Sequence, residues 1–559
     1  MTHQGAPLLS FDSWDFWWEN NKDRFLELKS RLNTANMVTG SISFATGRGR
    51  KTRSSGTRRP DRLMVDTEII PALLQLLAEE SDADILDSTL LALARTTDAT
   101  FASQVADAAN ELLSHPKLSV RTSAALSLGV LGSETSTQLL VDIASDNSAG
   151  KRAVGGGSPH FLVRSFAAIS LGLIADPDGV DTLMAVIDEL SDSDFEIKVG
   201  AIVALGLLGP DHIRADDARG FLETALVDRK LNELIKSFIP TSLGKLGKRD
   251  SVPALLATFV DRDTGRSVRQ SAAIGLGQIA EMADTEVVEL LLDYVEAGRD
   301  AQTRHFALIS LGEIGARDER PHDHAELHER LTRQFQTEIR KRGKSQQHRS
   351  WAALAGALYA REHAAAQPEL IEQILAAYEK ESDLAYKGGF AIALGLLGSK
   401  AAGDTLWEDY QDSADQTFRG YVAVALGFIQ YFDASEVLRR QVQDKTITPT
   451  FRLQVATALG LMSDAEAVPV LVDTLANART LGVSSAVAKA LGLIGDRDSI
   501  GRLKGIAQDE RRQKITRAFA CVALGIVGER TDLPWNAAIS ANNNYRAKVS
   551  SIEEVLDIL

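Results

Sequence analysis

Three histidines form the most suggestive group for chemistry in this sequence. The segment RPHDHAELHER contains His322, His324 and His328. On a helix, His324 and His328 would lie one turn apart and could share a metal ion with a carboxylate such as Glu329. Pro321 and the many charged neighbours instead favour the exposed start of a helix, with Asp323 as its cap. We therefore predict no metal site here.

The common catalytic motifs are missing from the sequence. It contains no G-x-x-x-x-G-K-[ST] phosphate loop, no G-x-S-x-G nucleophile turn and no H-E-x-x-H zinc motif. Its single cysteine, Cys521, excludes an internal disulfide and argues against a cysteine-based zinc site. These observations predict a protein that is not an enzyme, with no catalytic residue, cofactor or metal.

A row of basic residues recurs at a fixed place in a repeated segment. In nearly every copy, such as VRTSAALSLGVLG from Val120, one lies eight positions before the glycine of a Leu-Gly pair. The arginines of this row that we select as candidate partner-binding residues are Arg121, Arg164, Arg269, Arg304, Arg419, Arg452 and Arg517. One interpretation is structural, with each side chain paired to an Asp or a backbone carbonyl of an adjacent unit. The other is a positive stripe that meets acidic ligands.

The repeat that positions this row is defined by its glycines. Most anchor glycines follow one another at intervals of 32 to 38 residues, and degenerate copies start at Leu86 and His348, which gives about thirteen units. Each copy follows a second amphipathic stretch with apolar residues at the helical period. The unit is therefore predicted to be helix A, turn, helix B, turn.

The anchor glycine should lie inside helix B, where it costs about 1 kcal/mol relative to alanine. Its recurrence indicates that neighbouring helices approach closely at this position. A second glycine follows three residues later in many copies and is predicted to end helix B in the left-handed conformation. This set is Gly132, Gly209, Gly247, Gly315, Gly398, Gly495 and Gly528.

The basic position, the small apolar run and the Leu-Gly-x-x-Gly segment resemble the HEAT-repeat superfamily, in particular its short units related to phycobilin-lyase-type repeats. The resemblance implies an all-α, right-handed α-α superhelix, a HEAT-like solenoid of about thirteen helical hairpins, with helix B on the concave face. Enzymes with similar repeats match less well. Deoxyhypusine hydroxylases hold iron with several His-Glu pairs, and this sequence has only His328-Glu329. No residue marks the bilin site of a lyase.

Three segments lie outside the array, which we place at residues 63–530. Residues 1–46 contain Trp14, Trp17 and Trp18 and are predicted to cap the open apolar end of the first repeat; the alternative is an aromatic patch that docks a partner. Residues 47–62 are basic and are predicted to be a flexible linker, with an arm for nucleic acid or an acidic partner as the alternative. Residues 531–559 are predicted to be a capping tail, or a tail that docks elsewhere.

The net charge and the first residues of the sequence exclude some classes of function. A net charge of −15 and a pI near 5.3 repel phosphates at long range, so general nucleic-acid binding is not expected. The start has no signal-peptide pattern, and no apolar run approaches the ~20 residues that span a bilayer. We predict a cytoplasmic, bacterial, monomeric protein without membrane contact, or a secreted one if an upstream leader is missing.

Together these features predict a non-catalytic protein–protein interaction scaffold that binds an extended protein partner along a concave helical surface. The first alternative is a HEAT-like lyase that acts on a protein-bound chromophore. The second is a nucleic-acid-associated protein that uses the basic arm at residues 47–62.

Overall fold

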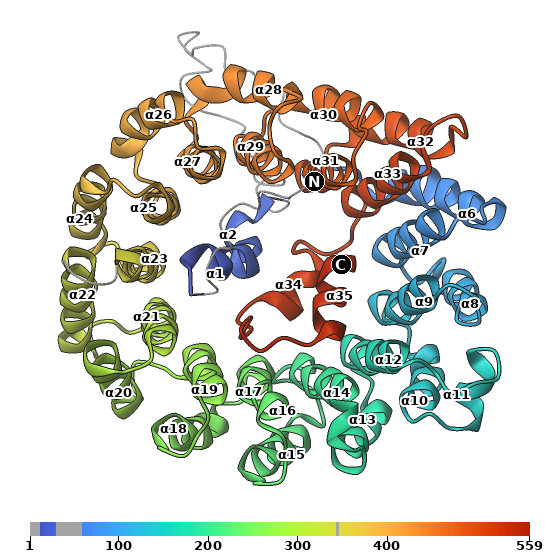
Figure 1. Cartoon of the computed structure of the whole chain (residues 1–559), viewed down its shortest axis with the longest axis horizontal. Helices are drawn as coiled ribbons and strands as arrows, with labels where there is room; N and C mark the ends of the chain where they lie inside the picture. The colour runs from blue at the N-terminus through green and yellow to red at the C-terminus, as the bar shows by residue number, and fades with distance from the viewer. Residues whose placement is uncertain (1–11, 29–58, 342–345) are drawn as a thin grey trace, which may run out of the picture. The chain divides into compact units, whose positions relative to one another are not determined.

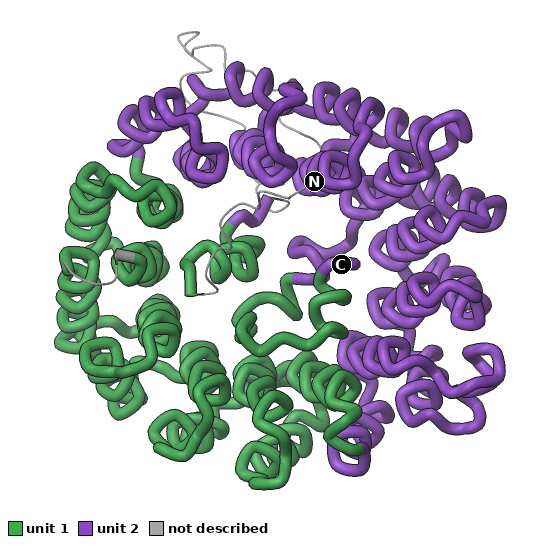
Figure 2. Tube along the Cα trace, viewed as in Figure 1, with its two compact units in different colours: residues 1–25, 191–399, 537–556 green, residues 26–190, 400–536, 557–559 purple. Residues whose placement is uncertain are grey.

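The computed structural model describes residues 12–28, 59–341 and 346–559, and over these ranges the chain is helical without a strand. No helix in these ranges is both long enough and apolar enough to cross a membrane. The chain divides into two compact units (Figure 2). Unit 1 holds residues 1–25, 191–399 and 537–556, and unit 2 holds residues 26–190, 400–536 and 557–559. The expected all-α repeat fold is confirmed.

Helices A and B alternate along the chain, and within each unit they form two layers (Figure 1). The A helices of unit 2 are α6 (Ile70–Glu79), α8 (Ala102–Leu112), α10 (Thr137–Ala144), α13 (Pro177–Glu189), α26 (Gly403–Asp412), α28 (Ser435–Gln443), α30 (Ala467–Ala476) and α32 (Ile500–Gln508). Its B helices are α7 (Ala83–Thr96), α9 (Leu118–Leu131), α12 (Phe161–Ile174), α27 (Gln416–Phe428), α29 (Pro449–Leu461), α31 (Leu481–Ile494) and α33 (Lys514–Val527).

Unit 1 has the same two kinds of helix. Its A helices are α15 (Ala215–Val227), α18 (Val252–Val260), α20 (Thr285–Ala297), α22 (Ala325–Arg340) and α24 (Gln367–Lys380). Its B helices are α14 (Phe195–Leu207), α17 (Ile239–Leu246), α19 (Arg266–Ile279), α21 (Ala301–Ala316), α23 (Gln346–Glu362) and α25 (Leu384–Leu396). The described residues thus contain thirteen A helices, eight in unit 2 and five in unit 1, and thirteen B helices, seven in unit 2 and six in unit 1. They form the thirteen hairpins expected from the sequence.

The anchor glycines lie where B helices of consecutive repeats touch. A β-carbon built on Gly129 of α9 would lie 2.6 Å from Cα of Ser170 in α12, and one on Gly206 of α14 would lie 2.8 Å from Cα of Ser242 in α17. These distances leave no room for a side chain. Ser170 also donates its hydroxyl to the carbonyl oxygen of Ala125 in α9 at 2.8 Å. The predicted close approach of helices at this glycine is confirmed.

The second glycine ends helix B as predicted in most of the seven copies that carry it. Five of the seven predicted glycines have a positive φ, for example 72° at Gly132. The prediction is wrong at Gly315, because α21 continues to Ala316, and at Gly528, where φ is −87°. Both are kept small by packing instead: a β-carbon would lie 2.7 Å from the ring of Tyr359 at Gly315 and 2.9 Å from Thr96 at Gly528.

The first and last hairpins pack on each other within unit 2. A β-carbon on Gly525 of α33 would lie 2.7 Å from Cα of Ala92 in α7, as if α7 were the next B helix in the series. Arg517 pairs with Glu80 at 2.8 Å and Lys514 with Asp82 at 2.7 Å. This packing differs from the expectation that the two end segments cap open apolar ends. The terminal repeats bury each other's apolar faces, so neither needs a cap.

We predict opposite effects for alanine at two helical glycines of unit 2. Gly129→Ala should destabilise the protein by about 1–3 kcal/mol, because the new methyl group would overlap Ser170. Gly505→Ala in α32 meets nothing within 4 Å and should gain up to about 1 kcal/mol from helix propensity. Urea unfolding followed by circular dichroism measures both. Equal effects of the two substitutions would contradict the contact argument.

Asp87 of α7 carries a half-buried carboxyl in the B layer of unit 2. Burial raises its pKa to about 6, although hydrogen bonds from Ser119 and Ser123 of α9 oppose the shift. Because this pKa lies above the unfolded value of 3.8, the folded state holds the proton more tightly. The stability that this contributes is complete below pH 3.8 and is lost as the pH rises through 6.

Asp87→Asn should therefore stabilise the protein at pH 7–8 by as much as about 3 kcal/mol, the equivalent of a two-unit pKa shift. The gain should shrink towards zero at pH 4, where Asp87 is already neutral. Denaturant unfolding at several pH values measures it. Asp84→Asn, an exposed carboxylate in the first turn of the same helix, is the matched control and should not gain stability.

Candidate functional site

The arginines of the basic row reach back to helix A of their own repeat. Arg452 donates from Nη2 to the carbonyl oxygen of Asp444 at 2.8 Å and from Nη1 to that of Val442. The same step of ten residues joins Nε of Arg517 to Ala507 O at 2.9 Å and Nε of Arg269 to Phe259 O at 3.1 Å. The acceptors lie at the ends of A helices, where carbonyls lack partners inside the helix and the helix dipole is negative.

The other arginines of the row vary this arrangement. Arg164 donates to Ala144 O at 2.9 Å, across an insertion that contains the short helix α11 (Ser148–Ala153). Arg419 donates to Oε1 of Gln441 at 3.1 Å and lies 4.6 Å from the ring centre of Tyr410. Nε of Arg121 and Nε of Arg304 are buried without a hydrogen-bond partner among the described residues. These contacts favour the structural interpretation, with carbonyls of the same unit as the main acceptors.

The three tryptophans are buried inside unit 1. Trp14, Trp17 and Trp18 all belong to α1 (Trp14–Asn21) and are 1%, 3% and 1% exposed. Trp14 donates from Nε1 to Ala385 O at 2.8 Å, at the start of α25, and Trp17 packs against Trp351 of α23. They therefore pack in the middle of the array and not on its first repeat. Their burial also leaves no indole exposed as a docking patch.

The C-terminal tail lies on the B helices of unit 1. Lys245 of α17 donates to three carbonyl oxygens at the end of α34 (Trp535–Ser540), those of Ala538, Ile539 and Ala541, at 2.7, 3.0 and 2.7 Å. Burial, with Arg24 nearby, lowers the pKa of Lys245 to about 7. The tail thus docks elsewhere, the second of the two alternatives, and does not cap the last repeat.

The second helix of the tail, α35 (Ser550–Ile558), is bound at its N-terminus, whereas α34 is bound at its C-terminus. Glu196 of α14 accepts hydrogen bonds from the backbone N–H groups of Ser550 and Ser551 at 3.0 and 2.8 Å. These two residues start α35. A cation at the C-terminus of α34 and a carboxylate at the N-terminus of α35 both complement the helix dipole.

The turn between the tail helices supplies two side-chain anchors. Asn544 is fully buried and donates from Nδ2 to Ser267 O and to Oγ of Ser271 in α19, both at 3.0 Å. The hydroxyl of Tyr545 accepts from Nε2 of Gln302 in α21 at 3.1 Å, and burial raises its pKa. Its ring meets Phe306 edge-on at 5.7 Å.

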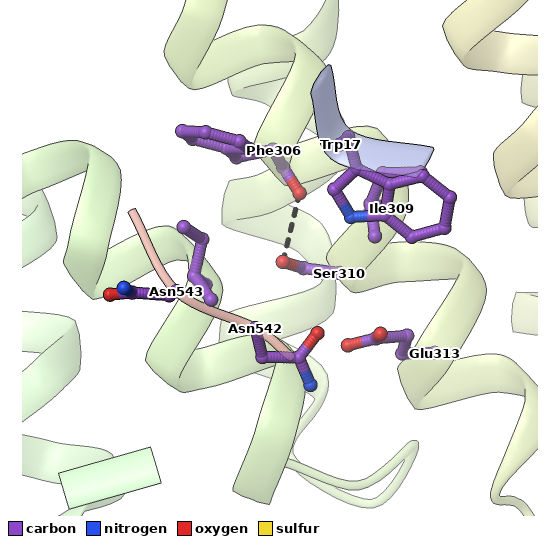
Figure 3. A pocket seen from close by; sticks show the side chains of 8 residues that line it. Trp17, Phe306, Ile309, Ser310, Glu313, Asn542 and Asn543 are labelled. Carbon is purple, nitrogen blue, oxygen red and sulfur yellow. Dashed lines mark hydrogen bonds between the residues drawn. The ribbon is translucent and has the colours of Figure 1, made fainter. Parts of the chain in front are cut away.

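The N-terminal segment and the tail meet over α19 and α21. Figure 3 shows Trp17 from one side and Asn542 and Asn543 from the other converging on Phe306, Ile309 and Glu313. The backbone N–H of Asn542 donates to Oδ1 of Asn21 at 2.9 Å, and Arg24 pairs with Glu313. We call residues 12–25 and 537–556 the end segments. The surfaces of α14, α17, α19, α21, α23 and α25 that they cover are the B face of unit 1 (Figure 2).

A polar triplet on this face escaped the sequence reasoning. Lys245, Gln278 and Glu313 each directly follow an anchor glycine in three successive repeats, and each bonds to an end segment. Every other repeat with an anchor glycine has Val, Leu, Ile or Phe at this position. Three adjacent departures from an apolar position are the signal in the sequence that could have located the site.

Two of the three clustered histidines, His324 and His328, form hydrogen bonds within the protein. Oδ2 of Asp318 lies 2.8 Å from both Nδ1 of His324 and Nε2 of His328, and Nδ1 of His328 lies 3.0 Å from the hydroxyl of Tyr359. Burial opposes ionisation of Asp318, but the bonds from both histidines lower its pKa to about 2. His322 is exposed. Among the described residues, no group of three or more His, Cys, Asp or Glu side chains is arranged to hold a metal ion.

The basic segment 47–62 is described only from residue 59. Arg59 pairs with Asp532 at 2.9 Å, and Arg62 starts α5 (Arg62–Met64) and pairs with Asp66 and Asp98 at 2.5 and 3.0 Å. These two arginines therefore bind acidic groups of unit 2. The rest of the proposed nucleic-acid arm, residues 47–58, lies outside the described residues.

We predict that Arg452→Met lowers the free energy of unfolding by about 1–3 kcal/mol, because the buried end of α28 loses its donor. Arg440→Met on the exposed side of the same helix should change it little, since surface ion pairs contribute little. Thermal melts compare the two variants. Unchanged stability with weakened partner binding in Arg452→Met would instead identify the row as a ligand-facing stripe.

Solved structures of other proteins resemble the fold of these repeats. No curated protein matches the chain. Yeast importin-beta is similar in structure, with 11% identity and a TM-score of 0.42 over 90% of this chain and 66% of that one. Another importin beta structure gives 13% identity and 0.40 over 83% and 73%. The phycocyanin lyase complex from Nostoc sp. gives 18% and 0.28 over 53% and 94%. These values describe a distant likeness in fold alone.

The family match is local. Residues 70–155, from α6 to α11, match the family model of HEAT repeats. The helix pair of this segment recurs along the described chain, with close glycine contacts between B helices in both units. Residues 70–155 are therefore HEAT repeats, and the expected resemblance of the repeats to the HEAT-repeat superfamily is confirmed.

Proposed function

We propose that this protein is a non-catalytic scaffold that binds an extended segment of a partner protein along the B face of unit 1. The observation that carries the proposal is the polar triplet. Lys245 and Gln278 donate to main-chain carbonyls of residues 538–542, which lie outside the repeats. A face that already binds polypeptide backbone can bind the backbone of another protein.

The order of the contacts supports an extended partner. Residues 538–541 bind Lys245 of α17, and residue 542 binds Gln278 of the next B helix, α19. Asn544 then binds α19, and Tyr545 binds α21. Successive B helices thus bind successive residues of one chain. Packed helices lie about 8–10 Å apart, which is close to three residues of extended chain at about 3.3 Å each. A repeat array can extend such binding from one hairpin to the next.

The contacts also suggest what is recognised. Most bonds from the triplet and from Glu196 go to backbone groups, which every polypeptide carries. Side-chain selection is confined to a few positions, such as the site of Asn544. Binding of this kind needs no reactive group, in keeping with a scaffold and not with a lyase.

A photo-crosslinking amino acid tests this function. Placed at Gln278 on the B face, it should form an adduct with one reproducible partner protein in cells. Placed at Glu329, on the exposed side of α22, it should form none. Mass spectrometry separates these adducts from links to the chain's own tail. Adducts only at Glu329, or none at either position, would refute the proposal.

A further inference from the structure

The tail is an incomplete ligand for the surface that it covers. Gln270 of α19 and Gln302 of α21 are 1% and 2% exposed, yet Oε1 of each side chain has no hydrogen-bond partner among the described residues. His305 of α21 is 1% exposed, and neither of its ring nitrogens has a partner in the described part of the chain. Each such group lowers the stability of the packed state, because it has lost its hydrogen bonds to water and has formed none within the protein.

These unpaired atoms lie next to the tail's anchors. Nε2 of Gln302 donates to the hydroxyl of Tyr545, whereas Oε1 of the same amide accepts no hydrogen bond from the described residues. Gln270 is adjacent in sequence to Ser271, which binds Asn544. His305 stacks on Trp351, which in turn donates to the carbonyl oxygen of Asp12 in the N-terminal segment. The unpaired groups thus lie on the two helices, α19 and α21, that bind Asn544 and Tyr545.

The tail is also held less closely than the repeats hold each other. Consecutive B helices such as α19, α21 and α23 pack along their length, whereas neither α34 nor α35 packs that closely on any described repeat helix. The tail is held by polar anchors, Lys245 and Glu196 at its helix ends and Asn544 and Tyr545 in its turn, and by buried apolar side chains such as Val555. A terminal segment attached in this way can be released locally without unfolding the array.

We propose that residues 537–556 are an intramolecular ligand that occupies the partner site on α17, α19 and α21 and that a partner segment displaces. This inference rests on the proposed function and adds its regulation and the partner's chemistry. The displacing segment presents an asparagine followed by an aromatic residue at the places that Asn544 and Tyr545 occupy. It outcompetes the tail by also pairing with the unpaired atoms of Gln270, Gln302 and His305.

Tethering explains why the closed state can persist with an imperfect ligand. A segment of the same chain acts at a high effective concentration, on the order of millimolar for a short flexible link. A free partner must overcome this advantage, so its apparent affinity falls by the fraction of molecules whose site is open. The protein therefore binds a partner only where that partner is abundant or fits better than the tail.

The test uses the full chain and a fluorescent peptide with the sequence of residues 537–556. In the chain variant Asn544→Ala/Tyr545→Ala, the tail loses the two anchors in its turn while the B face keeps all of its residues. Fluorescence anisotropy should show the peptide binding this variant about tenfold or more tightly than the wild-type chain. A matched peptide that carries the same two substitutions should bind neither protein.

The outcomes separate the alternatives. A peptide that binds neither chain would show that the covered face is a permanent core, and equal affinity for both chains would show that the tail does not compete; either result overturns the inference. If circular dichroism shows that the double variant is not folded, Tyr545→Phe, which removes only the hydroxyl on Gln302, takes its place and should bind the peptide more tightly than wild type. Equal affinity would again overturn the inference. Partner adducts at Gln278 with no peptide competition would leave the scaffold function standing without this regulation.

Discussion

The missing side chain at the anchor glycine is the constraint on which the rest of the structure depends. A β-carbon at Gly129, Gly206 or Gly525 would lie within 2.9 Å of the next B helix. Consecutive B helices can therefore touch through their backbones, and the serine hydroxyls at these contacts bond to the neighbouring helix, as Ser310 does to Ala273 O at 2.8 Å. The same contact joins α33 to α7. Because α7 accepts α33 just as any B helix accepts its neighbour, unit 2 buries the apolar faces of its terminal repeats without a dedicated cap.

A tightly packed B layer favours one kind of ligand. Small residues at the helix contacts leave little room for a deep pocket, and the space that Trp17, Phe306 and Asn542 enclose on unit 1 admits about one water molecule at most. The B face offers instead a row of side chains at the spacing of the repeats, which matches a polypeptide better than a compact small molecule. The end segments use it in this way, through main-chain groups at Lys245, Gln278 and Glu196.

The repeat was predictable because its signals are local and recur. The Leu-Gly pair, the basic residue eight positions earlier and the amphipathic stretch between them defined thirteen hairpins, including the degenerate copies at α7 and α23. The Trp-rich segment and the tail occur once, so no periodicity indicates where they bind. Nothing local in the WDFWW segment pairs Trp14 with Ala385, and nothing local in the tail pairs Asn544 with Ser271, more than 270 residues apart in each case. Only the run of polar residues after three anchor glycines carried that information.

The chemistry that binds the tail is an adaptation of the chemistry that folds the repeats. Within a hairpin, Arg452 and Arg517 neutralise the carbonyl end of helix A. On the B face of unit 1, Lys245 does the same for α34, and Glu196 performs the opposite task at the start of α35. Helix ends carry partial charges and unpaired backbone groups whatever their sequence. One substitution of an apolar residue by Lys or Gln after the anchor glycine is then enough to add a backbone-binding group to a repeat. A repeat array can acquire a docking site in this way one hairpin at a time, which accounts for a site built from three adjacent repeats and not from the whole array.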